Sequence, residues 1–218
     1  MRMDNDSFFN FPWNYAISDN FLNQDDLAVL LLSLKNIEVD DKEHLVFTQT
    51  FDKQGAMIIG KKNANSLGDI LENKFIDLLH KRYSMRVFSY LKFHNYWKSF
   101  LYSECEIRLQ ISGKNYIDPI HTDGYRKLVT GVIYLYPNKA HGTVVYDKNG
   151  NVSTETILDW KVNRCMKFSR TNCSFHTFKG NGISKRATLV FNFSSTHHRL
   201  IRVIDTILSI FYCKKRMY

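Results

Sequence analysis

The sequence has 218 residues, of which 44% are hydrophobic and 14% aromatic, enough to bury a substantial core in one domain. Because charged residues make up 23% and there are only 10 Gly and 3 Pro, disordered, collagen-like and linker-dominated chains are excluded. The net charge of +9 is uneven: residues 1–50 contain three basic and nine acidic residues, whereas residues 161–218 contain 12 basic residues and one acid.

Residues 1–100 are predicted to be mainly helical. After an extended segment at residues 8–21, Asn23 is suited to cap a first helix, and two aspartates follow in its first turn. Leucines spaced by three and four residues mark the buried face of this helix: Leu27, Leu30, Leu31 and Leu34. A second helix is predicted at residues 66–83, where apolar residues again recur at helical spacing.

From residue 101 the hydrophobic pattern changes from helical to alternating, which predicts strands. Six segments have this pattern: residues 107–112, 129–136, 143–146, 152–160, 165–169 and 187–194. Helices followed by short strands indicate an α+β fold in which a helical layer packs on a β-sandwich or barrel. We therefore expect one domain with three parts: a helical support layer at 1–100, a β core at 101–195, and a C-terminal helix with a basic tail at 196–218.

Nothing in the sequence predicts a membrane span or secretion. The longest apolar stretch, residues 27–34, is too short to cross a bilayer, and the acidic amino terminus does not resemble a signal peptide. The cysteines form no CxxC pair: Cys105, Cys165, Cys173 and Cys213. We therefore expect reduced thiols in a cytoplasmic protein.

One histidine is followed two positions later by a carboxylate, in the segment His121-Thr122-Asp123. In an extended segment residues i and i+2 point to the same side, so one metal ion could bind both side chains. His176, which follows a predicted strand, is the leading candidate for a third ligand. Two histidines and one carboxylate are the facial triad of non-haem Fe(II) oxygenases. His141 is a rival, but it precedes a glycine in a loop, and we expect it to be exposed or near the substrate.

A lone arginine, Arg186, opens the apolar strand predicted after His176. A cation that points into a barrel is costly unless it meets an anion, and the planar guanidinium suits a carboxylate. Thr188 lies two residues later, so it faces the same side and could donate its hydroxyl to the same group.

These linked motifs resemble the Fe(II)/2-oxoglutarate-dependent dioxygenase family, in its prolyl 4-hydroxylase-like branch. The resemblance spans residues 107–193. The HxD motif and His176 match the iron ligands, which makes His121, Asp123 and His176 the implied metal-binding and catalytic residues. Arg186 and Thr188 match the family residues that hold the far carboxylate of 2-oxoglutarate.

Further matches and departures lie on the preceding strands. Tyr134 stands where a family tyrosine can also reach the cosubstrate carboxylate. The tyrosine that many relatives carry about ten residues before the first iron ligand is replaced by Ile111, and Gln110 could offer a polar contact instead. Tyr136 replaces the usual asparagine, and Gly142 is the one glycine left of the usual pair. These departures affect the expected substrate more than the expected reaction.

The resemblance implies a double-stranded β-helix (jelly-roll, cupin-like) core and a hydroxylase. Its cofactors would be Fe(II), 2-oxoglutarate and O2, with ascorbate as an optional addition, and its products would include succinate and CO2. The substrate class stays open between a peptidyl residue, an amino acid and a small anionic molecule; the basic second half favours an anion. Two alternatives remain: a basic protein that binds or modifies nucleic acid, and a catalytically silent β-barrel that serves as a binding module.

The remaining polar residues have plainer interpretations. Arg126 and Lys127 could contact substrate at the pocket mouth, but surface solvation is favoured. Five further histidines are expected to be structural or to form a polar corner before the last helix: His44, His80, His94, His197 and His198. The apolar helix predicted at residues 200–212 is expected to pack on the barrel, with an anionic membrane surface or a homodimer contact as alternatives.

Overall fold

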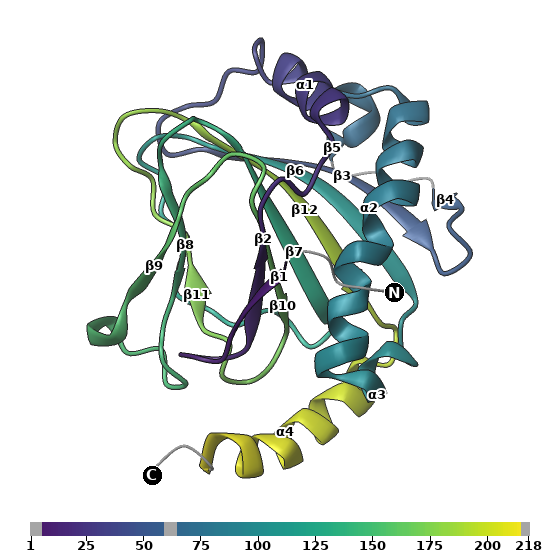
Figure 1. Cartoon of the computed structure of the whole chain (residues 1–218), viewed down its shortest axis with the longest axis vertical. Helices are drawn as coiled ribbons and strands as arrows, with labels where there is room; N and C mark the ends of the chain where they lie inside the picture. Colours follow the sequence, from purple (N-terminus) through teal and green to yellow (C-terminus); the bar gives the residue numbers. More distant parts are fainter. Residues whose placement is uncertain (1–5, 59–64, 215–218) are drawn as a thin grey trace.

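The computed structural model describes residues 6–58 and 65–214, with side chains described up to residue 208. In the described residues, strands form two sheets that face each other (Figure 1). The larger sheet has the order β1 (Asp6–Phe9), β2 (Tyr15–Ser18), β10 (Cys165–Ser169), β7 (Lys127–Tyr136), β12 (Arg186–Ser194), β6 (Glu104–Ser112), β3 (His44–Asp52) and β4 (Met57–Ile58), with β5 (Asn65–Ser66) paired to β3. The smaller sheet has the order β11 (His176–Thr177), β8 (His141–Val145) and β9 (Thr156–Asp159). Because these pairings are antiparallel apart from β3 with β5, the core is jelly-roll-like, as the sequence predicts.

Helices cover the side of the larger sheet that faces away from the smaller one (Figure 1). They are α1 (Gln24–Ser33), α2 (Asn73–His94) and the short α3 (Tyr96–Ser99), whereas α4 (His198–Lys214) follows the last strand. The predicted cap of α1 is confirmed, because the side chain of Asn23 accepts a hydrogen bond from the backbone N–H of Asp26 at 2.8 Å. α2 comes very close to β7 at Gly131, where an added Cβ would lie 2.6 Å from Val87. Glycine at this position therefore allows the helix to pack directly on the sheet.

Two apolar clusters result from this layering. The larger one joins the helices to the outer face of the nine-stranded sheet, and Leu30, Val87 and Phe191 are among its buried members. The smaller one lies between the two sheets and consists of Trp13, Tyr15, Val145, Leu158, Met166 and Phe168. The inner cluster matters for function, because the rings of Trp13 and Phe168 pack against the predicted ligand His176.

The first half of the chain differs from its prediction as a helical layer. It supplies the strands β1 to β5 as well as helices, and β3 pairs with β6 along its whole length of nine residues. The first five residues of β3 are all half-buried, so this strand has no clear division into a buried and an exposed face there. The first 100 residues are therefore not a purely helical support for the barrel.

Two element boundaries also differ from the sequence pattern. The segment predicted to start the second helix forms a single 3₁₀ turn, η1 (Leu67–Asp69), closed by a capping box between Ser66 and Asp69. α2 therefore begins later, at Asn73, and continues to His94. The strand predicted at residues 152–160 begins as a second 3₁₀ turn, η2 (Val152–Thr154), and becomes extended only in β9.

The cysteines of the chain differ in their bonding. Cys105 and Cys165 are buried free thiols, but Cys173 is disulfide-bonded, so the expectation of reduced thiols is wrong for this residue. The side chain of Cys213 and the basic tail at 215–218 lie outside the described residues. Within the described part of the chain, we find no helix with the length and apolar character needed to span a membrane.

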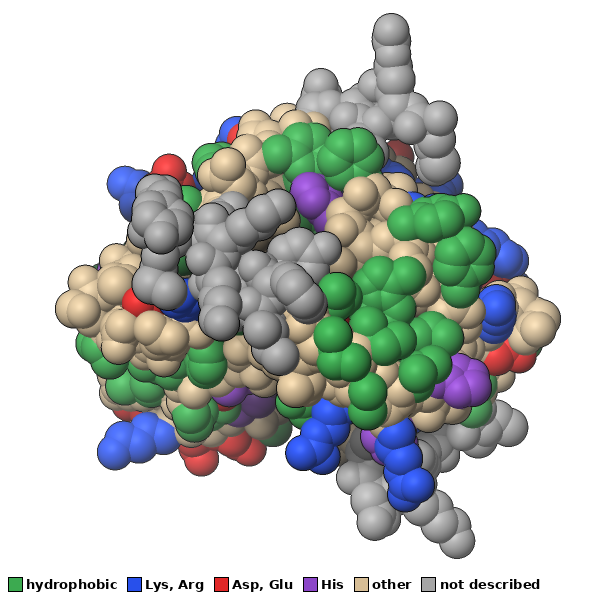
Figure 2. Space-filling model, turned by 90° about the horizontal axis from the view of Figure 1, so that it is seen from below, with side chains coloured by type: hydrophobic (Ala, Val, Ile, Leu, Met, Phe, Trp, Pro, Cys, Tyr) green, Lys and Arg blue, Asp and Glu red, His purple; other side chains and the backbone are tan. Residues whose placement is uncertain are grey.

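α4 is apolar on two sides. Ile201 is fully buried against the rest of the protein, as the predicted packing on the barrel requires, whereas Leu200, Val203 and Ile207 are exposed on its outer side. Figure 1 shows α3 and α4 at the lower end of the molecule, and the view from below in Figure 2 shows hydrophobic side chains gathered there, with Lys and Arg side chains near their edge.

Candidate metal centre

The two histidines of the predicted triad are joined by a short backbone bridge. His121 lies in the loop between β6 and β7, and His176 begins β11. The backbone N–H of His121 donates to the carbonyl of His176 at 3.1 Å, and the N–H of His176 donates in return at 2.9 Å. The ring centroids are 4.6 Å apart. The bridge therefore places two segments that are distant in sequence side by side.

Both imidazole rings are oriented to present Nε2 to a ligand. Nδ1 of His121 lies 2.8 Å from the carbonyl oxygen of Pro119, and Nδ1 of His176 lies 2.9 Å from that of Ser174. Because a carbonyl can only accept, Nδ1 carries the proton in each neutral ring, which leaves the lone pair on Nε2. Burial lowers the pKa of His176, so this ring is neutral at pH 7, as a metal ligand must be.

Asp123 completes the cluster. One potential ligand atom from each of His121, Asp123 and His176 lies within 4.8 Å of the others. Asp123 is buried, and its Oδ1 accepts a hydrogen bond from Nζ of Lys127 at 2.5 Å, while Oδ2 accepts one from Oγ1 of Thr130 at 3.0 Å. Burial acts to raise the pKa of Asp123, but the nearby positive charge and these hydrogen bonds outweigh it and lower the pKa. The group is therefore an ionised carboxylate beside two imidazole nitrogens, which is a donor set suited to Fe(II).

Arg186 is a buried cation that has no anionic partner among the described residues. It opens β12 and is 8% exposed, and its Cζ lies 3.6 Å from the ring centroid of Phe178 and 5.1 Å from that of Trp160. Its Nε has no hydrogen-bond partner in the described structure. Burial lowers the pKa of Arg186 to about 10, so the guanidinium remains charged at neutral pH. A site of this kind fits a carboxylate from a ligand, which would supply the missing partner.

The other predicted cosubstrate residues lie in one row across three strands. Thr188 of β12 is opposite Gln110 of β6 on one side and Tyr134 of β7 on the other. Oγ1 of Thr188 is 3.5 Å from Oε1 of Gln110. The hydroxyl of Tyr134 donates to Oγ1 of Thr143 at 3.0 Å and accepts from the Thr143 N–H at 3.0 Å. The ring centroid of Tyr134 is 5.7 Å from Cζ of Arg186, while its hydroxyl is hydrogen-bonded to Thr143 in the opposite sheet.

The structure adds residues that the sequence interpretation did not assign to the site. Lys127, expected to be solvated, is instead bonded to Asp123, and its position four residues after Asp123 was the available signal. Trp160 and Phe178 pack on Arg186, and no local pattern marks them. Arg126 is exposed and paired with Glu104, consistent with the predicted surface position. His141, the rival ligand, is exposed at the start of β8 and is not part of the metal-ligand cluster.

Comparison with known proteins gives matches in structure but none in sequence. No family model matches the chain, and no curated protein matches its sequence. The protein IDO of Bacillus thuringiensis aligns with a TM-score of 0.62 at 16% identity, covering 84% of this chain and 90% of that one. A prolyl hydroxylase of Trichoplax adhaerens, solved with a peptide fragment of the oxygen degradation domain of hypoxia inducible factor, aligns with a TM-score of 0.52 at 14% identity, covering 86% of each chain.

An oxidoreductase of Burkholderia pseudomallei, from the 2OG-Fe(II) oxygenase family, aligns with a TM-score of 0.51 at 12% identity, covering 83% of this chain and 84% of that one. Each of these alignments includes most of both chains, so the likeness extends beyond the strands of the barrel. At such low identity it shows a shared fold, and the chemistry of the site has to be argued from this chain's own residues.

Proposed function

We propose that this chain, whose fold is that of the prolyl hydroxylase-like 2-oxoglutarate oxygenases, is an Fe(II)- and 2-oxoglutarate-dependent dioxygenase. It would hydroxylate its substrate and release succinate and CO2. One observation carries the proposal: the same jelly-roll core contains a His-Asp-His cluster and a buried arginine with no anionic partner among the residues that the structure describes. The cluster fits a divalent metal, and the arginine fits a dicarboxylate.

Three side chains would bind the metal, and two others orient the carboxylate ligand. Nε2 of His121, Nε2 of His176 and one oxygen of Asp123 would hold Fe(II). When bound, the iron and the keto acid supply the oxidising chemistry that activates O2. Lys127 and Thr130 hold the carboxylate of Asp123 in one orientation, so that little reorganisation is needed when a metal binds.

Arg186 would bind the carboxylate of 2-oxoglutarate that is remote from the metal. The flat rings of Phe178 and Trp160 fix the guanidinium and keep water from it, which strengthens a bidentate contact. Thr188 and Gln110 lie on the same face of the sheet and supply polar atoms beside the carboxylate. Tyr134 stacks on Trp160 at 4.5 Å and forms the wall of the arginine site.

The proposed function leaves three substrate classes open. The substrate is a peptidyl residue, an amino acid or a small anionic molecule. Because one structural neighbour was solved with a peptide, peptides are the first class to screen. A single domain, a cytoplasmic location and a homodimer contact likewise stay predictions.

Stepwise loading tests the proposed function directly. Addition of Fe(II) and then 2-oxoglutarate under anaerobic conditions is expected to produce the weak visible charge-transfer band that keto-acid chelation to ferrous iron gives. The band should be absent in His176→Ala and present in His141→Ala, because His141 is exposed and outside the cluster. Tight Fe(II) binding without a band would contradict the 2-oxoglutarate assignment, and loss of the band in His141→Ala would contradict the ligand set.

The binding of 2-oxoglutarate is expected to depend on pH through Arg186. Its pKa is about 10 in the protein without ligand, lowered by burial from the usual value of 12.5. An anion stabilises the charged form, so affinity should be constant below pH 10 and fall above it by up to roughly tenfold per pH unit. Titrations from pH 7 to 10.5, with circular dichroism to confirm folding, would measure this. In Arg186→Met the residual affinity should show no such decrease.

A further inference from the structure

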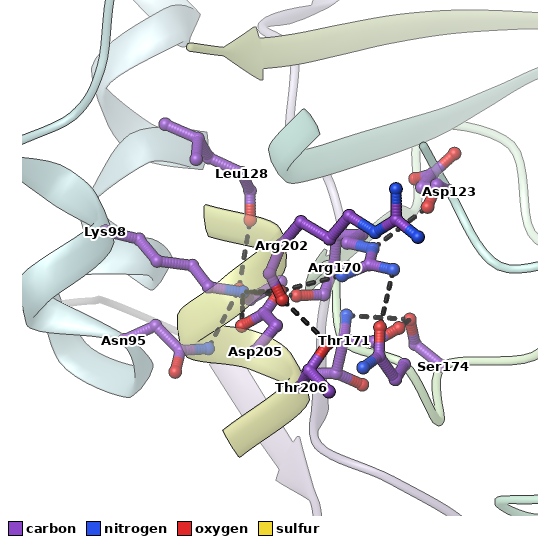
Figure 3. A network of polar contacts seen from close by, with 12 residues as sticks. Asn95, Lys98, Asp123, Leu128, Arg170, Thr171, Ser174, Arg202, Asp205 and Thr206 are labelled. Carbon is purple, nitrogen blue, oxygen red and sulfur yellow. Dashed lines mark hydrogen bonds and ion pairs between the residues drawn. The ribbon is translucent and has the colours of Figure 1, made fainter. Parts of the chain in front are cut away.

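A buried group of three charged side chains joins α3, α4 and the loop after β10 (Figure 3). The side chains of Lys98, Arg170 and Asp205 are 1%, 3% and 7% exposed. One carboxylate oxygen of Asp205 is 2.8 Å from Nζ of Lys98, and the other is 2.7 Å from Nη1 of Arg170. Two buried cations therefore share one carboxylate, which is supplied by α4. Such an arrangement is strongly destabilised when one partner is removed.

Arg170 connects this group to the candidate metal centre. Its Nε donates to the backbone carbonyl of Asp123 at 2.9 Å, and Nη2 donates to the side-chain oxygen of Asn172 at 2.7 Å. Its Cζ lies 3.9 Å from the ring centroid of Tyr125. Figure 3 shows Arg170 lying between Asp205 and Asp123. A single guanidinium thus contacts both the C-terminal helix and the residue that offers the carboxylate ligand.

The residue after Asp123 is Gly124, which has no side chain that could hold the backbone at this point. A Cβ added to Gly124 would meet nothing within 4 Å, and its carbonyl accepts a hydrogen bond from the backbone N–H of Lys127 at 3.0 Å. Lys127 and Thr130 bind the carboxylate of Asp123, whereas Arg170 binds its main-chain carbonyl. The side chain and the main chain of Asp123 are therefore both held by hydrogen bonds.

We propose that Arg170, itself held by Asp205 of α4, is a positioning residue that fixes Asp123 for metal binding. The docking of the C-terminal helix then supports the affinity of the metal centre, although none of the three proposed ligands lies on α4. The inference rests on the proposed function, since it takes Asp123 as a metal ligand. Lysine cannot replace Arg170 in this role, because one ammonium group cannot reach in two fixed directions as the planar guanidinium does.

Arg170→Lys is the decisive variant, because it keeps a positive charge for Asp205 while losing the fork that reaches the Asp123 carbonyl. Titration of the metal-free protein with Co(II), followed by visible absorption, is expected to show binding weaker by roughly 10- to 100-fold. Thermal unfolding of the metal-free protein should change much less. The matched control is Arg202→Lys. Cζ of Arg202 lies 5.6 Å from the centroid of the same Tyr125 ring, but Arg202 is exposed. The Co(II) affinity of this variant should be unchanged.

The outcomes separate this inference from the proposed function. Absence of Co(II) binding by the unmodified protein would overturn the metal centre itself and, with it, this role. Wild-type Co(II) affinity in folded Arg170→Lys would overturn the positioning role and leave the metal centre intact. If Arg170→Lys does not fold, Asp205→Glu replaces it, since this change keeps the charge and displaces the carboxylate. Its Co(II) affinity should be lower by roughly threefold or more, and an unchanged value would overturn the inference.

Discussion

Asp123→Ala is expected to abolish detectable Fe(II) binding and all metal-dependent succinate release. The change removes the one carboxylate of the cluster, and two imidazole groups alone hold Fe(II) weakly. Because loss of a partner outside the ligand set typically lowers metal affinity by roughly 10- to 100-fold, loss of a ligand should exceed roughly 100-fold. Titration of the metal-free protein with Fe(II) under anaerobic conditions measures the affinity, and a coupled succinate assay measures turnover.

The same variant has a limited effect on folding. Lys127 loses its partner, but its side chain is 27% exposed and can turn to solvent. The variant also loses the buried hydrogen bond from Thr130 to Asp123. We expect destabilisation of about 1–3 kcal/mol, the usual cost of removing one partner of a buried hydrogen bond, and a folded protein by circular dichroism. His141→Ala is the matched control for removal of a polar side chain near the barrel, and it should bind Fe(II) normally. Fe(II) affinity within threefold of wild type in Asp123→Ala would refute the ligand assignment.

Arg186→Met is expected to weaken 2-oxoglutarate binding by at least roughly 100-fold, while Fe(II) binding stays near wild type. Truncating one side of a buried, charged contact typically costs 2–5 kcal/mol, and about 3 kcal/mol corresponds to this factor. Methionine keeps much of the side-chain volume, so the packing of Phe178 and Trp160 is preserved. Calorimetric titration with 2-oxoglutarate in the presence of an inert divalent metal measures the effect.

Replacement of the arginine should leave the stability of the ligand-free protein unchanged or raise it. Arg186 is a buried cation without an anion among the described residues, and replacing such a group with an apolar side chain is commonly neutral or stabilising. We therefore expect an equal or higher Tm for Arg186→Met, together with the loss of 2-oxoglutarate binding. Arg186→Lys should retain partial affinity, since charge survives without the bidentate fork. Arg126→Ala removes an exposed cation and should change neither property.

The strands of the second half and the candidate ligands could be predicted from the sequence for a physical reason. β10 and β12 are buried along their whole length, so both are rich in apolar residues, and β10 matches its predicted bounds. The HxD motif places two ligands on one side of a short segment through backbone geometry alone. Arg186 was identifiable because a charge at the head of an apolar strand needs a partner.

The strands of the first half could not be predicted in the same way. β3 is half-buried over its first five residues, and its pairing with β6 arises from contacts between distant segments. The role of Lys127 likewise depends on the fold. Lysine is usually a surface residue, and this one becomes a partner of Asp123 only when the loop folds. The bond of Tyr134 to Thr143 likewise depends on how the two sheets face each other.

The sequence by itself determined the chemical identity of the site: two imidazoles, one carboxylate and one arginine. The spacing of His121 and Asp123 indicated a shared site, because residues i and i+2 of an extended segment point to the same side. Only the tertiary structure decided which groups surround them. It packed Arg186 against the rings of Phe178 and Trp160, with no anion beside it in the described part of the chain, and it joined Asp205 of the last helix to Asp123 through Arg170. The reason is that these contacts join elements remote in the chain, so their distances are set by the packing of sheets and helices and not by any local pattern.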